Sequence, residues 1–346
     1  MALGSNHATI TTAANFIPEQ WSDETIATYK AKLVLGNLVT KMSFKGKKGD
    51  TLHLPVPARG SGSVKAANAQ VTIIADTAGV VNLLVDKHYE YSKMYEDIAE
   101  LQALSSMRRF YTDDAGYALA KQVDQDLMLL GHGFNGGATA ASATLYETAV
   151  LGGDGSTAFS GAANTNTGNG TALTDAAIRK MIQTLEDQDV DSEGLVMVLP
   201  PVVANSLRGT ARFTEQAFVG NGSAIKTGKI AELYGVEVYT SSNCPWIHVN
   251  SVTGTQSVNF SGTTLTTSYV DSFGLTVDWA TSTPTDTKYR AGLIMHKDAM
   301  ALAEQQSIRT QSQYKQEYLG TLVTSDTVYG VKELRDYAAL SFIVPA

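Results

Sequence analysis

The chain of 346 residues has one cysteine, eight prolines and few charged side chains. Because Cys244 stands alone, the chain cannot form an internal disulfide, and a metal cage built on several thiolates is excluded. Charged residues make up 17% of the sequence, against roughly 25% in ordinary soluble chains. A chain that neighbours cover needs fewer charges, so the composition favours assembly.

Long apolar runs and basic patches are also missing. The net charge is −8, and the lysines and arginines are scattered, so strong non-specific binding to a phosphate backbone is not expected. No run of about 18 apolar residues occurs. The first 30 residues lack the basic start and apolar stretch of a secretory signal. We therefore expect a protein that neither spans a membrane nor is secreted, and that folds in a reducing cytoplasm.

Several segments resemble catalytic or ligand-binding motifs, but the residues around them do not fit such sites. Gly131, Gly133 and Gly136 match GxGxxG but follow a predicted helix, so a helix end explains them better than a dinucleotide site. Residues 223–230 imitate a phosphate loop but lack its first glycine and its magnesium-binding hydroxyl. Residues 189–200 begin like a calcium loop and end on proline. The six histidines show no metal-binding spacing. The sequence predicts no catalytic, cofactor or metal site, and no enzyme.

The first 90 residues predict two segments that have too little packing surface in an isolated subunit. Residues 1–44 are mostly polar with a few large apolar anchors, and predict either a frayed terminus or, if ordered, an arm that docks on a neighbour. Residues 45–90 hold two strand-like runs around a Gly/Ser-rich tip and predict an extended hairpin. An isolated two-stranded hairpin is marginal in water, so it needs a partner surface. We expect four side chains here to contact another subunit: Phe16, Trp21, Arg59 and Lys65.

Residues 91–131 carry the clearest helical pattern. Apolar side chains recur at three- and four-residue steps from Ile98 to Leu130. Ser92 fits an N-cap, and the glycines at 131 and 133 fit the end. If Gly116 does not break it, this spine helix is about 50 Å long, and Ile98 lies on its buried face.

The rest of the chain predicts a connection, an α/β region and closing strands. Residues 132–173 are rich in small residues and predict a flexible connection, with a small hairpin around 145–150 as an option. From 174 to 305 helices and strands alternate: Thr174 fits an N-cap, 195–199 a buried strand, and Pro201 a helix start. Within it, residues 250–290 predict an inserted loop. Residues 306–346 alternate as strands that pack with the spine helix.

Six segments carry a resemblance to a known family: GDTLHLPVP (49–57), VDKHYEYSK (85–93), LVMVLPPVVANSL (195–207), KIAELYGVEVYTSSNCP (229–245), AGLIMHKDAMALA (291–303) and YGVKELRDYAALSF (329–342). With the order of the parts, they resemble the HK97-like major capsid proteins of tailed double-stranded DNA bacteriophages, and look closest to those of short-tailed phages. The resemblance spans nearly the whole chain. The closing segment departs from the family's usual LRPEA, since Asp336 and Tyr337 follow Leu334 and Arg335.

The resemblance implies an α+β fold with an N-terminal arm, an extended hairpin lying over an adjacent subunit, a spine helix, a peripheral domain and an α/β axial domain at residues 174–305. It implies self-assembly into hexamers and pentamers of an icosahedral shell around the phage genome, without catalysis or cofactors. The implied partners are copies of the chain, a scaffolding protein, a portal protein, and double-stranded DNA enclosed without sequence-specific binding. The implied location is the virion, assembled in the bacterial cytoplasm.

Two alternatives stay open at this point. An encapsulin-like compartment housing a cargo enzyme would have the same fold, and the contents of purified particles, cargo peptides or DNA, would decide. A small-molecule enzyme would need a site that the sequence does not show.

Overall fold

The computed structural model describes residues 33–43, 49–56, 60–71, 73, 79–98, 107–134, 145–161, 167–210, 232–279 and 286–346. The phosphate-loop-like segment at 223–230, residues 1–32 of the predicted arm and three of the four predicted contact residues, Phe16, Trp21 and Arg59, lie outside these ranges. Lys65 lies inside them. The arm prediction is wrong for residues 33–43, because Val34 and Leu35 are buried in the core of their own subunit and Thr40–Ser43 pair with β14 (Met300–Lys315). Over the described ranges, no helix has both the length and the apolar character needed to cross a membrane.

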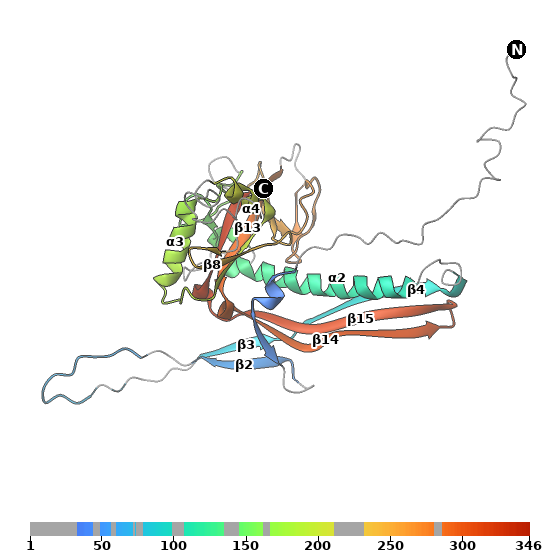
Figure 1. Cartoon of the computed structure of the whole chain (residues 1–346), viewed down its shortest axis with the longest axis horizontal. Helices are drawn as coiled ribbons and strands as arrows, with labels where there is room; N and C mark the ends of the chain where they lie inside the picture. The colour runs from blue at the N-terminus through green and yellow to red at the C-terminus, as the bar shows by residue number, and fades with distance from the viewer. Residues whose placement is uncertain are drawn as a thin grey trace, which may run out of the picture.

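Two sheets and one long helix organise the fold (Figure 1). A four-stranded sheet has the order β1-β14-β15-β4, with α2 running along it. An eight-stranded sheet has the path β10-β9-β13-β6-β8-β7, and β16 joins it through β13 and β5. A two-stranded hairpin, β2–β3, projects away from both (Figure 1). The main elements are β1 (Thr40–Ser43), β2 (Thr51–Val56), β3 (Gly79–Leu84), β4 (Lys87–Glu96), α2 (Met107–Leu129), β5 (Val150–Leu151), α3 (Asp175–Glu186), β6 (Leu195–Leu199), α4 (Pro201–Arg208), β7 (Glu232–Leu233), β8 (Val236–Thr240), β9 (Trp246–Asn250), β10 (Gln256–Asn259), β11 (Tyr269–Val270), β12 (Thr276–Val277), β13 (Asp286–His296), β14 (Met300–Lys315), β15 (Gly320–Glu333) and β16 (Ala339–Pro345).

The α/β region follows its local signals. The Thr174 hydroxyl accepts a hydrogen bond from the Ala177 N–H at 3.2 Å and caps α3. The apolar face of α3 is buried against β6, which is buried along its whole length. Pro201 occupies the first turn of α4, where its missing N–H costs nothing. The predicted helix starts and the buried strand are confirmed.

The predicted start of the spine helix is wrong. Ser92 is no N-cap, because it lies in β4 opposite Thr324 of β15. Ten consecutive β4 residues pair with β15, and this long-range ladder overrides the local helical pattern. The α2 helix begins at Met107 and has 23 residues, so it is about 34 Å long rather than about 50 Å. Ile98 is 59% exposed, so its predicted burial is also wrong.

From Met107 onward the helix prediction is confirmed, whereas residues 99–106, with the predicted face residues Leu101 and Leu104, lie outside the described residues. Gly116 lies within α2 without breaking it. Ala115, Leu119 and Leu127 are buried. The helix passes into a short 3₁₀ turn, Leu130–Gly133, at the predicted glycines.

The predicted flexible connection is corrected for residues 145–161, which belong to the core. Tyr146 and Phe159 are each 1% exposed, and the Tyr146 hydroxyl donates to the Met128 carbonyl at 3.1 Å. Val150 and Leu151 form β5, parallel to β16, and Val150 also bridges to Ala158. The aromatic anchors outweigh the small residues around them, because each buries a large apolar area.

Parts of the predicted inserted hairpin or loop at 250–290 belong to the large sheet. β10 extends that sheet beyond β9, and β13 begins at Asp286. Only β11 and β12 form a separate small hairpin, and the Trp279 side chain that follows it is fully buried. The closing strands divide between the sheets: β14 and β15 pair with each other, whereas β16 pairs with β13.

Candidate assembly interface

The β2–β3 hairpin presents an apolar stripe that runs past the body of the subunit. Leu52, Leu54 and Val56 alternate along β2 and lie opposite Leu83, Val81 and Gly79 of β3. Since side chains alternate between faces, these residues share one face of the hairpin. At the root Leu83 is fully buried, whereas Val56 is 45% exposed at the far end. The stripe is therefore covered only where it meets its own subunit.

The root of the hairpin is held by close backbone contact. Leu83 packs with Ala301 and Ala303 of β14. A Cβ added at Gly330 of β15 would lie 2.2 Å from the Leu84 carbonyl oxygen. Only glycine permits this approach. The hairpin therefore leaves the body in a fixed direction.

The tip of the hairpin extends far from the body (Figure 1). Residues 60–71 are all exposed, and Asn68 adopts the left-handed conformation with φ of 62°. Val64 and Ile73 are exposed apolar side chains. Lys65 is exposed at this tip, where the sequence placed it; its contact with another subunit stays a prediction.

A second group of exposed apolar side chains lies at the far end of the four-stranded sheet. The exposed side chains range from 44% for Met94 to 67% for Leu319, and the others are Ile98, Tyr314 and Tyr318. They gather where β14 turns into β15 beside the end of β4. Sequence reasoning missed this group, since it assigned Ile98 to a buried helix face.

An ionic cluster stabilises the middle of the same sheet. Arg309 donates from Nε and Nη2 to the two carboxylate oxygens of Asp326 at 3.0 and 2.8 Å. Gln306 donates to Asp326 at 2.8 Å, and His88 Nε2 lies 3.3 Å away. Hydrogen bonds from Arg309, Gln306 and His88 lower the pKa of Asp326 to about 2. The cluster spans the register shift between β14 and β15.

Replacing Asp326 by asparagine is expected to destabilise the unassembled subunit in a pH-dependent way. The lowered pKa means that the carboxylate stabilises the fold above the ordinary pKa of about 4, and that this contribution is lost as the pH falls toward 2. Urea unfolding of both proteins from about pH 7 to about pH 2 should show a stability gap that closes over the lowest two units. A gap of constant size would contradict this assignment.

Two buried carboxylates on α2 tie the sheets together. Asp124 Oδ1 accepts from the backbone N–H groups of Val34 and Leu35 at 3.1 and 2.8 Å, and its Oδ2 accepts from Asn243 Nδ2 at 2.9 Å. Asp126 accepts from the Tyr329 hydroxyl at 2.7 Å and lies 3.2 Å from Lys87 Nζ. The sequence pattern did not predict this role, because a charged residue on a helix usually faces solvent.

Chemistry-bearing residues do not gather into an active site in the described ranges. No group of three or more His, Cys, Asp or Glu side chains there is placed to hold a metal ion. Burial raises the pKa of the Cys244 thiol to about 12, so it is a neutral apolar side chain. The calcium-like segment is a turn in which Asp191 accepts from the Glu193 N–H.

Comparison with known proteins identifies this architecture. A family model described as phage capsid protein matches residues 95–301, more than half of the chain. The chain also resembles a structure from Mycobacterium phage Che8, at 22% identity with a TM-score of 0.65, covering 95% of this chain and 97% of that one. The capsid of cyanophage P-SCSP1u gives 16% identity, a TM-score of 0.68, and coverage of 99% and 96%. The acid-stable capsid of Helicobacter pylori bacteriophage KHP30 has 14% sequence identity and a TM-score of 0.65, and the match covers 99% of both chains.

At these identities the likeness to the solved structures shows the fold, and no curated protein matches the chain. Members of the matched family build shells and are not enzymes. The exposed hairpin and the exposed end of the four-stranded sheet are the features that such a subunit requires. The chain belongs to the phage capsid protein family, and is a shell-forming major capsid protein with the HK97-like fold.

Proposed function

We propose that the chain assembles into hexamers and pentamers that close an icosahedral shell around a double-stranded DNA genome. In a ring, each subunit uses one surface to contact the next and a different surface to receive the previous one. The hairpin is well placed for such a contact, because it reaches beyond the body of its own subunit (Figure 1).

The observation that carries this proposal is the gradient of burial along the hairpin. The face that packs on β14 at Leu83 continues as apolar residues to Val56, which its own subunit does not cover. A two-stranded hairpin has too little core to be stable alone in water. An adjacent copy that covers the stripe supplies the missing surface.

The division of labour that we propose has six parts: an arm at 1–32, the hairpin at 45–90, the spine at 91–131, a connection at 132–173, an axial domain at 174–305 and closing strands at 306–346. The packing of α2 on β14 and β15 supports a peripheral domain that joins the spine to the closing strands. We assign contacts between subunits to Phe16, Trp21, Arg59 and Lys65.

Further partners in this proposal are a scaffolding protein and a portal protein. The net charge of −8 supports a wall that encloses DNA without binding particular sequences. Assembly in the bacterial cytoplasm fits the single buried cysteine. We also assign the chain to a short-tailed phage, on the segments that resemble that group.

Expression of the full chain, with and without a scaffolding protein from the same phage, tests the proposal. Sedimentation and negative-stain microscopy should show rings, sheets or closed particles far larger than the 36.9 kDa monomer. Particles purified from infected cells should contain DNA and no cargo enzyme. A chain that stays monomeric at all salt and protein concentrations, or particles filled with a cargo protein, would refute it.

A further inference from the structure

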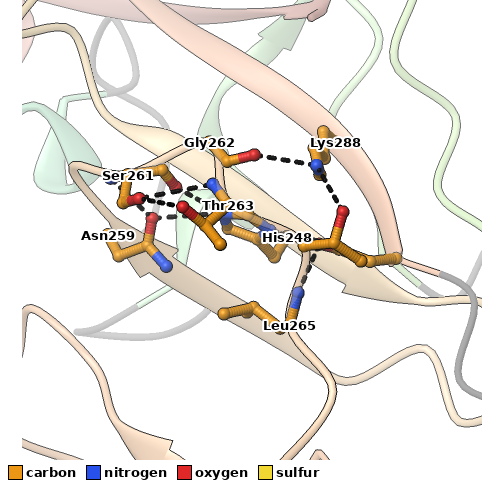
Figure 2. A network of polar contacts seen from close by, with 9 residues as sticks. His248, Asn259, Ser261, Gly262, Thr263, Leu265 and Lys288 are labelled. Carbon is orange, nitrogen blue, oxygen red and sulfur yellow. Dashed lines mark hydrogen bonds and ion pairs between the residues drawn. The ribbon is translucent and has the colours of Figure 1, made fainter. Parts of the chain in front are cut away.

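The loop that joins β10 to β11 is tied to the large sheet by three ionisable side chains, in addition to the packing of Phe260 against the core. We define the latch loop as residues Phe260–Ser268. Apart from Phe260, Gly262 and Leu265, which are half-buried, its side chains are exposed. The side chains of His248 and Asp286, which grip it, are fully buried. Figure 2 shows the grip at close range.

Three side chains of β9 and β13 hold the loop by four contacts. His248 Nε2 lies 2.9 Å from the Ser261 carbonyl oxygen. The Leu265 N–H donates to Asp286 Oδ2 at 3.0 Å. Lys288 Nζ donates to the Gly262 carbonyl at 2.8 Å and to the Thr264 hydroxyl at 2.9 Å (Figure 2). Three ionisable groups, His248, Asp286 and Lys288, therefore hold the latch loop by hydrogen bonds.

The geometry around His248 requires a hydrogen on both ring nitrogens. Nδ1 lies 2.9 and 2.8 Å from the two carboxylate oxygens of Asp286, which accept hydrogen bonds. Nε2 faces the Ser261 carbonyl and, at 3.1 Å, Asn259 Oδ1, which already accepts from the Ser261 N–H. Both nitrogens thus face acceptors only, so the imidazolium form satisfies every contact. A neutral ring would turn one lone pair toward an oxygen.

The other groups around the ring are consistent with a single charged pair. Lys288 lies opposite His248 in the β9–β13 register, but its Nζ is directed to the latch loop. From β10, the facing residues are the neutral Ser257 and Asn259. The guanidinium carbon of Arg290 lies over the Trp246 ring, 4.3 Å from its centroid.

Three aromatic residues complete the surroundings of the ring, and Trp246 lies tilted to it at 6.5 Å between ring centroids. Trp279 meets it edge-on at 6.5 Å. Burial raises the pKa of Tyr269, next to Asp271, and keeps its hydroxyl neutral. Asp286 is therefore the carboxylate in direct contact with the imidazolium.

The latch loop leads directly to the β11–β12 hairpin, whose turn reaches the joint between α2 and the extended hairpin. The Phe273 ring meets His132, at the end of α2, edge-on at 4.9 Å. Ser272 and Phe273 line a cavity of about 480 Å³ together with Leu84 and Lys87 at the hairpin root. The β11–β12 turn therefore lies beside the base of the extended hairpin.

We propose that protonated His248, paired with Asp286 and assisted by Lys288, latches Phe260–Ser268 onto the large sheet, and that loss of the proton releases this loop and loosens the β11–β12 turn at the hairpin root. The latch depends on this proton, because only a ring protonated at both nitrogens donates to Asp286 and to the Ser261 carbonyl together.

Amide hydrogen exchange of the unassembled full chain tests the latch between about pH 5.5 and about pH 9, with labelling times scaled to the intrinsic exchange rate at each pH. In the unchanged protein, protection of a peptide covering 260–268 should fall about tenfold or more as the pH rises, the size expected for one hydrogen bond to a charged group. Protection of β6 should stay constant. Equal protection of the loop at both ends of the range overturns the proposal, without reference to any variant.

Two variants separate the roles of the cluster. His248→Gln should give a loop with low protection at every pH, without the step, that is, the fall in protection as the pH rises. Lys288→Met removes a different tie, so it should lower protection at every pH but keep the step. A step that persists in His248→Gln, or that disappears in Lys288→Met while the loop remains protected, would show that His248 is not the switch.

Discussion

Replacing Asp124 by leucine is expected to remove on the order of 3–5 kcal/mol from the free energy of unfolding, enough to leave most of the subunit insoluble at 37 °C. The carboxylate is 1% exposed and accepts three hydrogen bonds. Leucine fills a similar volume but leaves the N–H groups of Val34 and Leu35 and the amide of Asn243 buried without an acceptor. Each orphaned donor costs about 1–3 kcal/mol. Urea unfolding measures the loss.

Asp124→Asn is the matched control for this experiment. Its side-chain oxygen can still accept from both backbone N–H groups, while only the contact with Asn243 is disturbed. We expect a loss of about 1 kcal/mol. If leucine and asparagine destabilise the subunit equally, or if leucine costs less than about 1 kcal/mol, then the carboxylate does not hold η2 (Leu35–Asn37) to α2.

Val56→Asp is expected to abolish assembly while leaving the fold of the subunit intact. Val56 is 45% exposed in the isolated chain, so the aspartate remains hydrated there. In the shell, the apolar stripe would be covered by a neighbour, and an unpaired carboxylate would lose its water at a cost of several kcal/mol. A penalty of about 3 kcal/mol per contact raises the concentration needed for assembly more than about a hundredfold.

Val80→Asp gives a matched comparison on the same hairpin. Val80 is 59% exposed and pairs with Pro55, so it lies on the opposite face from the stripe. Circular dichroism should show that both variants are folded. Sedimentation should show that Val80→Asp assembles, whereas Val56→Asp assembles little or not at all. If Val80→Asp blocks assembly as strongly as Val56→Asp, the stripe is not the covered face. Normal particles from Val56→Asp would remove the stripe from the interface altogether.

Local signals predicted the elements whose ends depend on neighbouring residues. Thr174 caps its helix through a contact three residues away, and Pro201 sets a helix start by its own ring. The β2–β3 pairing also follows from a pattern that is local to the hairpin. The resemblance to capsid proteins added the order of the parts, which the family model and the solved structures support.

Distant partners decided the features that sequence reasoning missed. Residues 91–96 were predicted as the start of a helix, but their ladder partner β15 lies more than two hundred positions later. The role of Asp124 depends on Val34 and Asn243, which are far away in both directions. Likewise His248 and Asp286 are 38 positions apart, so no motif marks them. A single sequence gives no sign of such pairs, because neither spacing nor periodicity reflects them.

The position of β16 also bears on how the chain is made. β16 pairs with β13 along seven residues and with β5, and its Phe342 and Ile343 are fully buried. The Ser341 hydroxyl donates to the Phe134 carbonyl across 207 positions of sequence. While ribosomes add residues at about 5–20 per second, the large sheet therefore stays open until residues 339–345 emerge. Nascent subunits on a polysome thus lack a finished body, which delays premature docking of one incomplete chain on another.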